Sequence, residues 1–337
     1  MKVMEMRDAW GVEHIKPGTR PERAPGPGDV LVKMAAASVN FRDFVMTRRG
    51  YGSHSGELPL IPLSDGAGWV SAVGPGVTRV KPGDLVCPAF AQRWIAGSMK
   101  EEHRAGMLGG MLDGVMQELM LLPQAGVVKA PKGWSALEAA TLPCAALTAW
   151  SAVIGSGVKA GDAVVTQGTG GVSLFAALFA KMQGAFVILT SSSDEKLARA
   201  KSFGADLGIN YRTHPEWSRE TRKALGGRGA DLIVELGGAE TLDQSLRAIR
   251  TSGTLAMIGV LSGATAELNL GRVVTQNVRL QGVTLGSRDA FEDMVRAIDL
   301  HGIKPPIDEK RYAFDEVADA IRAIAAGRHF GKICIEF

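Results

Sequence analysis

Residues 164–172 read Val164-Val165-Thr166-Gln167-Gly168-Thr169-Gly170-Gly171-Val172. The β-branched residues before Gly168 are typical of a buried strand, and the apolar stretch from Gly171 to Gln183 indicates a helix. Glycine permits a tight turn and a close approach to a pyrophosphate, which the first amides of the helix would receive. A second strand, Ala185–Thr190, completes the βαβ context. We therefore predict that Gly168, Thr169, Gly170, Gly171 and Val172 bind a dinucleotide.

The third glycine position of this fingerprint holds Ser173, which predicts slightly looser packing between helix and strand. The alternative interpretation is a glycine turn in a doubly wound sheet that binds no ligand. The strand before the turn, the helix after it and the second strand favour the dinucleotide site.

Strands and helices alternate around this turn, which predicts a parallel sheet covered by helices on both faces. The expected strands are Ala163–Gln167, Ala185–Thr190, Gly208–Tyr211, Leu232–Leu236, Thr254–Val260 and Leu280–Leu285, and the expected helices are Gly171–Gln183, Asp194–Phe203, Trp217–Leu225 and Thr241–Arg250. Before them, Ser135–Ile154 reads as a helix that starts with a Ser135/Glu138 capping box and is kinked or divided by Pro143.

The first third of the chain differs, because short apolar runs alternate there with glycine and proline. This pattern indicates a small, barrel-like β domain. Two helices, Ala290–Leu300 and Phe314–Ala326, precede a last strand, Lys332–Phe337, which we expect to return to the first domain.

Composition excludes several classes of protein. The 337 residues, 46% hydrophobic and 22% charged, suit two globular domains, and the formal charge of +3 gives no reason to expect nucleic acid or an anionic membrane as partner. We find no signal peptide and no apolar run approaching the length of a membrane span. The three cysteines form no CxxC pair, so we expect a reducing cytoplasm, no disulfide framework and no structural zinc.

The end of the second strand bears on the choice of cofactor. An acidic residue there would bind the ribose 2′-hydroxyl of NADH, but this strand ends in Ser191-Ser192-Ser193. Ser191 and Ser192 could donate hydrogen bonds to a 2′-phosphate and Lys196 could supply charge, which favours NADPH, with NADH possible. Asp194 and Glu195 argue the other way. Alternatively, the serines only cap the next helix, with Ser192 and Glu195 forming a box.

Motifs along essentially the whole chain resemble the medium-chain dehydrogenase/reductase superfamily, above all its zinc-independent quinone oxidoreductase branch and the alcohol-dehydrogenase-like proteins grouped with it. Besides the glycine turn, the resemblance rests on Ser38-Val39-Asn40-Phe41-Arg42-Asp43, Asp65-Gly66-Ala67-Gly68, Val80-Lys81-Pro82-Gly83-Asp84-Leu85-Val86, Ala139-Ala140-Thr141-Leu142-Pro143, Leu147-Thr148-Ala149-Trp150, Ile209-Asn210-Tyr211-Arg212 and His329-Phe330-Gly331-Lys332.

The resemblance implies an α/β chain with two domains: a GroES-like, mostly β catalytic domain built from both termini (1–126 and 288–337), and a doubly wound Rossmann domain (127–287). It implies a homodimer through edge strands of the Rossmann sheets, here Leu280–Leu285. Tyr211 matches a position that contacts the 2′-phosphate in NADPH-using members. We also expect Asn40, Thr148, Leu236, Gly259, Leu285 and Lys332 to contact the dinucleotide.

Zinc-dependent members supply a cysteine, a histidine beside a glutamate, and a later cysteine or aspartate as catalytic ligands. The matching positions here hold Asn40, Ser64 followed by Asp65, and Cys144. An amide and a hydroxyl are poor zinc ligands, so we expect no metal, and Cys144 reads as a small buried hydrophobic residue.

Without a Lewis acid, hydride transfer is easiest to the β-carbon of a quinone or an α,β-unsaturated carbonyl compound. Asn40, Tyr51 and Ser64 are candidate donors to the substrate oxygen or in a proton relay, although each has a structural alternative: a turn, an apolar wall and a backbone contact. Arg42 could pair with Asp43 to fix its loop, the role we favour, or could activate a ketone.

The leading hypothesis is therefore a zinc-independent, NADPH-dependent oxidoreductase that transfers hydride to quinones or α,β-unsaturated carbonyl compounds. The alternatives are an NAD(P)-dependent alcohol dehydrogenase or carbonyl reductase and, in a different class, a non-catalytic NADPH-binding protein.

Overall fold

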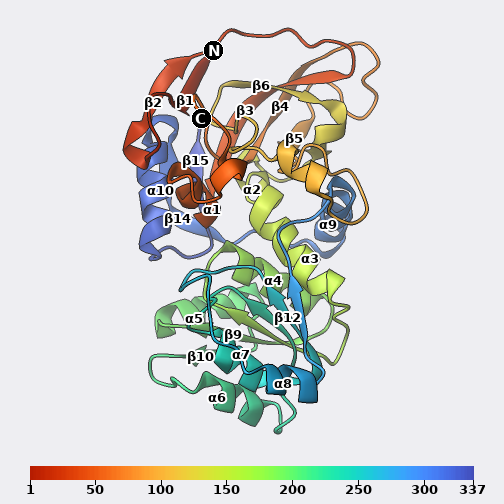
Figure 1. Ribbon diagram of the computed structural model, residues 1–337. Helices are drawn as coiled ribbons and strands as arrows, with labels where there is room; N and C mark the ends of the chain where they lie inside the picture. The colour runs from red at the N-terminus through yellow and green to blue at the C-terminus, as the bar shows by residue number, and fades with distance from the viewer. The chain divides into compact units, whose positions relative to one another are not determined.

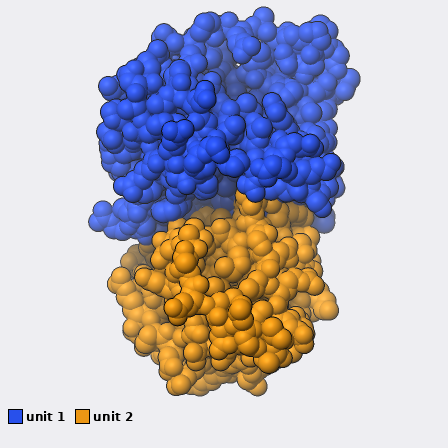
Figure 2. Space-filling model, viewed as in Figure 1, with its two compact units in different colours: residues 1–147, 286–337 blue, residues 148–285 orange.

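The chain forms two compact units in a computed structural model that describes residues 1–337 (Figure 2). Unit 1 comprises Met1–Leu147 and Gly286–Phe337, and unit 2 comprises Thr148–Leu285. The first boundary therefore lies at 147 rather than at the predicted 126. The physical reason is that β7 (Val127–Lys129) pairs with β5 (Leu85–Pro88), and α2 (Ala136–Ala139) packs against the unit 1 sheet.

Unit 2 is built on a six-stranded sheet in which every pairing is parallel (Figure 1). Its strands are β8 (Ala163–Gln167), β9 (Phe186–Ser191), β10 (Leu207–Asn210), β11 (Ala230–Glu235), β12 (Ile249–Met257) and β13 (Arg279–Gly282). They lie in the order β10-β9-β8-β11-β12-β13, which is the 3-2-1-4-5-6 order of a Rossmann sheet. The predicted doubly wound fold is confirmed.

Helices connect these strands and cover the sheet: α4 (Gly171–Met182), α5 (Asp194–Ala200), α6 (Trp217–Ala224), α7 (Leu242–Ala248) and α8 (Leu270–Thr275). Every residue of β8 and of β11 is buried, as expected for central parallel strands rich in Val and Ile. Helix α8 was not predicted, and β12 begins five residues before the predicted Thr254.

Unit 1 contains a seven-stranded sheet and a separate two-stranded sheet, β1 (Lys2–Met6) with β2 (Ile15–Thr19). The larger sheet follows the order β14-β15-β3-β4-β5-β7, with β6 also paired to β3. Besides β5 and β7, its strands are β3 (Asp29–Val39), β4 (Asp65–Val73), β6 (Leu119–Pro123), β14 (Ile307–Ala313) and β15 (Lys332–Glu336). The unit's longer helices are α1 (Phe41–Thr47), α9 (Arg288–His301) and α10 (Val317–Ala326).

The last strand returns to the first domain, as predicted. β15 runs antiparallel to β3, with Ile333 opposite Val39 and Cys334 opposite Ser38. This register places Lys332 beside the end of β3, where α1 begins. Two ends of the chain thus build one site.

The apolar segment after β7 is helical and interrupted at Pro143, as predicted: α2 is followed by a π-helical turn, Leu142–Ala146 (η5), and then by α3 (Leu147–Gly155). The capping box is present, since Glu138 N–H donates to Ser135 Oγ at 3.2 Å and Ser135 N–H donates to Glu138 Oε2 at 2.8 Å. Contrary to expectation, Ala136–Gly155 is long and apolar enough to cross a membrane, but 67% of its most apolar window is buried in the protein, as in the core helix of a soluble protein.

Candidate functional site

Asn40 lies at the junction of β3 and α1, where the backbone changes from extended to helical. Its backbone N–H donates to Asp43 Oδ2 at 2.7 Å, which fixes the first turn of α1. The residue is only 9% exposed. Its side-chain nitrogen Nδ2 is buried and has no hydrogen-bond partner within the protein.

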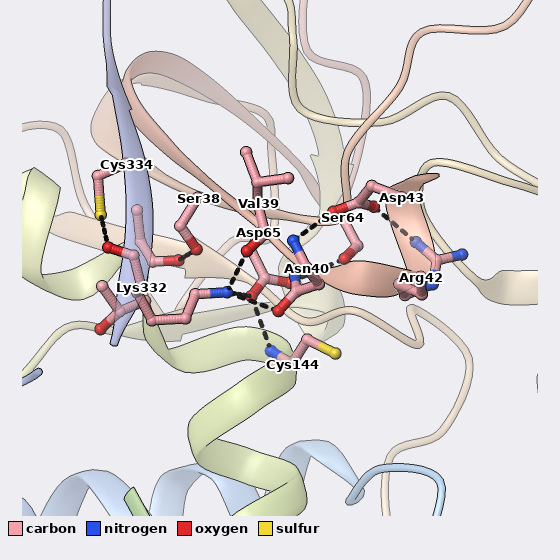
Figure 3. Close-up of polar contacts among 12 residues, drawn as sticks. Ser38, Val39, Asn40, Arg42, Asp43, Ser64, Asp65, Cys144, Lys332 and Cys334 are labelled. Atoms are coloured by element: carbon pink, nitrogen blue, oxygen red, sulfur yellow. Dashed lines mark hydrogen bonds and ion pairs between the residues drawn. The ribbon is translucent and has the colours of Figure 1, made fainter. Parts of the chain in front are cut away.

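The other end of the Asn40 amide meets Lys332, which enters from β15 (Figure 3). Lys332 Nζ donates to Asn40 Oδ1 at 2.5 Å and to the Val39 carbonyl at 2.9 Å, and lies 3.5 Å from Asp65 Oδ2. Lys332 is 2% exposed and Asp65 is fully buried, so each charge is paired inside the protein. Lys332 directs its ammonium group into this network, where Asp65 and two oxygens surround it, and its predicted contact with the dinucleotide stays a prediction.

Asp65 begins β4 and connects the remaining residues of the network. Its Oδ1 accepts the Ser64 hydroxyl at 2.8 Å, and its Oδ2 accepts the backbone N–H of Cys144 at 3.1 Å. Ser64 is fully buried and its proton is committed to Asp65. In this arrangement Ser64 supports Asp65, which favours the structural alternative, and its predicted role as a donor or in a proton relay stays a prediction.

Arg42 forms the structural ion pair that we favoured from sequence. Its Nη1 donates to Asp43 Oδ1 at 3.2 Å and to the Leu108 carbonyl at 3.3 Å, while the guanidinium lies 4.5 Å from the centre of the Phe90 ring. Burial raises the pKa of Asp43 to about 6, against the opposing effect of Arg42. Asp43 thus titrates near neutral pH beside Asn40.

Tyr51, the remaining predicted donor, follows α1 and is 46% exposed. The pKa of its phenol is raised, first by partial burial and then by Cys144 and Asp43, while Arg42 acts in the opposite direction. Tyr51 therefore keeps its proton at neutral pH, and its phenol interacts electrostatically with Arg42, Asp43 and Cys144. Its predicted role as a donor stays a prediction.

These residues do not fit a catalytic zinc ion. Asn40 Oδ1 accepts from the Lys332 ammonium, and the Ser64 hydroxyl donates to Asp65. Burial, together with Asp65, raises the pKa of the Cys144 thiol to about 12, which opposes formation of the thiolate that binds metal. No group of three His, Cys, Asp or Glu side chains is positioned to hold a metal ion.

In unit 2, the glycine turn fits a dinucleotide phosphate. Gly168 has φ 78°, a left-handed conformation that favours glycine, and its N–H donates to the Thr190 carbonyl at 2.7 Å. No side chain caps the N-terminus of α4, which leaves its first turn open to an anion. Ser173 does not loosen the packing as predicted, because its buried hydroxyl donates to the Gln167 carbonyl and ties α4 to β8.

The serines after β9 gather where β9 and β10 end. Ser191 lies opposite Asn210 in the sheet, and the Tyr211 N–H donates to the Ser191 carbonyl at 3.0 Å, so Tyr211 stands beside the serines. The helix cap is Ser193, whose Oγ accepts the Lys196 N–H at 3.3 Å, so the Ser192/Glu195 box that we gave as the alternative is not formed. Asp194 is held by the Asn210 amide at 2.9 Å.

The other predicted dinucleotide contacts have defined places in unit 2. Gly259 must be glycine, since a Cβ there would lie 2.3 Å from the Leu236 carbonyl oxygen. Thr148 directs its hydroxyl at the Thr284 carbonyl at 3.3 Å, and Leu285 is buried. Contact between these residues and a cofactor stays a prediction.

Glu235 and Gln167 form a buried network that was not predicted. Glu235 ends β11 and is 0% exposed. Its carboxylate accepts from five donors, namely the side chains of Gln167, Thr241 and Ser245 and the N–H groups of Gly237 and Gly238. Gln167 ends β8 and accepts from Leu236 N–H at 3.0 Å. The sequence signal was a polar residue at the end of each of two apolar strands.

This network lies where the winding of the sheet reverses, between β8 and β11. Ligands of doubly wound sheets bind at such a switch point, beyond the carboxyl ends of the strands. Glu235 and Gln167 therefore fix the 236–241 turn beside the predicted dinucleotide site.

Two family models match the chain: an alcohol dehydrogenase GroES-like domain at residues 26–132 and a zinc-binding dehydrogenase at residues 171–299. A zinc-type alcohol dehydrogenase-like protein of Schizosaccharomyces pombe is 40% identical over 317 residues, covering 92% of this chain and 91% of the relative. A putative alcohol dehydrogenase from Sinorhizobium meliloti 1021 has a solved structure with 43% identity and a TM-score of 0.91, covering 100% of this chain and 99% of that one.

Other similar structures differ in the cofactor or activity for which they are named. An NAD-dependent alcohol dehydrogenase is 34% identical with a TM-score of 0.90, and both chains are fully covered. A mycobacterial protein complexed with NADPH is 27% identical with a TM-score of 0.82, again with full coverage of both. A quinone oxidoreductase of Pseudomonas syringae is 27% identical with a TM-score of 0.83, covering 100% of this chain and 99% of the other.

The two matched segments overlap the two observed sheets: 26–132 contains β3 to β7 of unit 1, and 171–299 contains β9 to β13 of unit 2. The likeness to the relatives extends over nearly the whole chain. This chain therefore belongs to the medium-chain dehydrogenase/reductase superfamily, among its alcohol dehydrogenase-like members, and is an NAD(P)H-dependent oxidoreductase.

Proposed function

We propose that this protein is a zinc-independent, NADPH-dependent reductase of α,β-unsaturated carbonyl compounds or quinones. The observation that carries the proposal is the closed Asn40–Lys332–Asp65 network, because Asn40 stands at one of the positions where, by the resemblance, zinc-dependent relatives hold a metal ligand. The network leaves one donor, Asn40 Nδ2, without a partner in the protein.

This donor set suits an extended acceptor better than a simple ketone. NADPH, when bound, supplies the hydride. Asn40 Nδ2 would hold the acceptor oxygen, where negative charge gathers after hydride reaches the distant carbon. Tyr51, which stays protonated at neutral pH, would return a proton. Neutral donors stabilise a delocalised enolate more readily than the localised alkoxide formed from a ketone.

The preference for NADPH rests on the group at the ends of β9 and β10. Ser191 is the last residue of β9, so no carboxylate ends that strand to receive a ribose 2′-hydroxyl. Tyr211 stands beside the serines, and Asp194 is already hydrogen-bonded to Asn210. The NADPH in the similar mycobacterial structure supports the same choice.

The experiment compares NADPH oxidation by the purified protein with an enone, a quinone and a saturated ketone, followed by product analysis by mass and NMR. We expect the enone to give a saturated ketone with its carbonyl intact. A predominance of allylic alcohol, or efficient oxidation of secondary alcohols, would overturn the proposal.

That second outcome corresponds to a carbonyl reductase or alcohol dehydrogenase, the alternative favoured by the names of the relatives. Arg42 is the residue that would serve it, because its guanidinium lies beside Asp43 in the same region of unit 1. Exchange of Arg42 for Lys or Met should then lower ketone reduction selectively.

We also propose a homodimer formed through β13. This strand is the edge of the unit 2 sheet, and its Leu280 is exposed. Further exposed apolar side chains of unit 2 lie in the segments around it in sequence: Val260, Leu261, Leu270 and Val274. An unpaired edge with apolar neighbours is suited to pairing with a second copy. Light scattering should give a dimer mass, and Leu280→Arg should give a monomer; a monomeric wild-type protein would refute the proposal.

A further inference from the structure

The buried Nδ2 of Asn40 has no partner in the protein, so what it can offer a ligand depends on which way the side-chain amide is turned. An asparagine amide can turn over and exchange its oxygen and nitrogen, which differ little in size. In one orientation it offers a donor to a ligand, and in the other an acceptor. Only the donor stabilises a developing negative charge, so something must hold the amide in that orientation.

Lys332 is the residue that can do so. An ammonium group has three donors and no acceptor, so it requires the oxygen of the amide to face it. Its Nζ lies 2.5 Å from Asn40 Oδ1. Turning the amide over would bring Nδ2 against the ammonium and leave Oδ1 unpaired, which is unfavourable on both counts. The orientation therefore follows from the chemistry of the two groups.

Asp65 holds Lys332 in place. The lysine is 2% exposed, and a buried charge is costly unless an opposite charge and hydrogen bonds accompany it. Asp65 Oδ2 lies 3.5 Å from Nζ, and the carboxylate is itself fixed by the Ser64 hydroxyl and the Cys144 N–H. Lys332 thus contacts Asn40 although the two residues are 292 positions apart in the sequence.

We infer that Lys332 and Asp65 are positioning residues that orient the Asn40 amide, so that Nδ2 is the donor to the substrate oxygen. This inference rests on the proposed function. Lys332 and Asp65 act on the reaction only through Asn40, and neither touches the substrate.

The test is a mutant cycle of four proteins: wild type, Asn40→Ala, Asp65→Asn/Lys332→Met, and all three changes together. The double variant removes both charges at once and leaves no buried ion unpaired. For kcat at saturating NADPH, we expect a loss of about a hundredfold for Asn40→Ala and of about tenfold for the double variant. The triple variant should match Asn40→Ala, because the pair has nothing left to orient.

An independent readout requires no turnover. The chain has four asparagines, Asn40, Asn210, Asn269 and Asn277, so ¹⁵N-asparagine labelling gives four side-chain amides. The Asn40 signal is the one missing in Asn40→Ala. Asp65→Asn adds one further side-chain amide to the double variant, and the triple variant, which lacks the Asn40 signal, identifies it. The Asn40 signal should shift in the double variant and, in wild type, on addition of the saturated ketone product.

Ser38→Ala is the matched control. Ser38 is buried in β3 opposite Asp65, but its hydroxyl donates to the Ala140 carbonyl at 2.8 Å rather than to Asn40, Asp65 or Lys332. This variant should keep the wild-type kcat and the Asn40 signal, and melting temperatures check the folding of every variant.

Three results would each overturn the inference. In the first, the fold-losses in kcat of Asn40→Ala and of the double variant multiply in the triple variant. In the second, the double variant has the kcat of wild type, and in the third, the double change leaves the Asn40 amide signal in place. A raised dissociation constant for NADPH with unchanged kcat in Asn40→Ala would also overturn it. Failure of wild type to reduce enones or quinones would reject the proposed function alone; the cycle is then run with the carbonyl compound that wild type reduces, and the amide signals need no substrate.

Discussion

Glu235→Gln replaces a buried carboxylate by an amide of the same shape. Glu235 is 0% exposed, and its two oxygens accept different donors. Oε1 receives the Gly237 and Gly238 N–H groups, each at 3.0 Å, and the Thr241 hydroxyl. Oε2 receives the Gln167 amide at 2.7 Å and the Ser245 hydroxyl.

The magnitude follows from these contacts. The three bonds to Oε1 would survive as neutral bonds, at a cost of about 1 kcal/mol each, because a bond to a charged group is worth roughly 1.5–3 kcal/mol and a neutral one roughly 0.5–1.5 kcal/mol. On the other side the new NH₂ group would face the Gln167 amide nitrogen, while Ser245 can turn to accept. Easier desolvation of a neutral side chain offsets part of this loss, so we expect unfolding free energy to fall by about 2–4 kcal/mol.

Urea unfolding of the full chain followed by circular dichroism measures the loss, and hydrogen exchange of the 230–245 segment locates it. Glu240→Gln is the matched control, because Glu240 lies in the same turn and is exposed. Its effect should stay within about 0.5 kcal/mol. If Glu235→Gln is as stable as Glu240→Gln, or if exchange of 230–245 is unchanged, the carboxylate does not hold this turn and the reasoning is refuted.

Three further predictions follow from the two sites. The purified protein should hold no stoichiometric zinc by elemental analysis and keep its activity in a strong chelator; about one zinc per chain, with activity lost on chelation, would contradict this. Lys196→Glu should weaken NADPH binding about ten- to a hundredfold and NADH binding far less, as measured by fluorescence titration; equal effects on both would show that the phosphate pocket is misplaced. The pKa of Asp43 is raised from 3.8 to about 6 in the folded protein. The stability that its protonated form contributes is therefore fully present below pH 3.8 and is lost as the pH rises through about 6. Relative to Asp43→Asn, wild type should lose about 3 kcal/mol between about pH 4 and 7 in denaturation experiments; parallel curves would refute the assignment.

Local pattern was enough for most of the secondary structure. The glycine turn, the helix break at Pro143 and the return of the final strand were predicted from sequence and are present. The predictions failed where several local solutions were equally good. Ser192 and Ser193 are both able to cap α5, and their hydroxyl chemistry does not distinguish them; the backbone path after β9 selects Ser193. Similarly, Ile249–Gly253 carries no strong strand signal, and pairing with β11 extends β12 through it.

For the candidate site, the sequence was a better guide to which residues belong to the site than to the role of each residue. Asn40, Ser64, Lys332 and Arg42 were all selected, and the structure brings all four into unit 1. Their roles depended on partners that sequence does not reveal. Ser64 becomes a support because Asp65 lies beside its hydroxyl, and Lys332 turns inward because β15 pairs with β3.

Sequence by itself determined the superfamily and the Rossmann unit, since these depend on residue identity and on spacing within short segments. The absence of two of the three zinc-ligand types is what the resemblance implies for Asn40 and Ser64. Tertiary structure alone decided that Lys332 faces Asn40 and Asp65, and that Glu235 meets Gln167 between β8 and β11. The physical reason is that hydrogen bonds and ion pairs act over a few ångströms in space. Residues distant in the chain come within that range only when strand pairing and register bring them together.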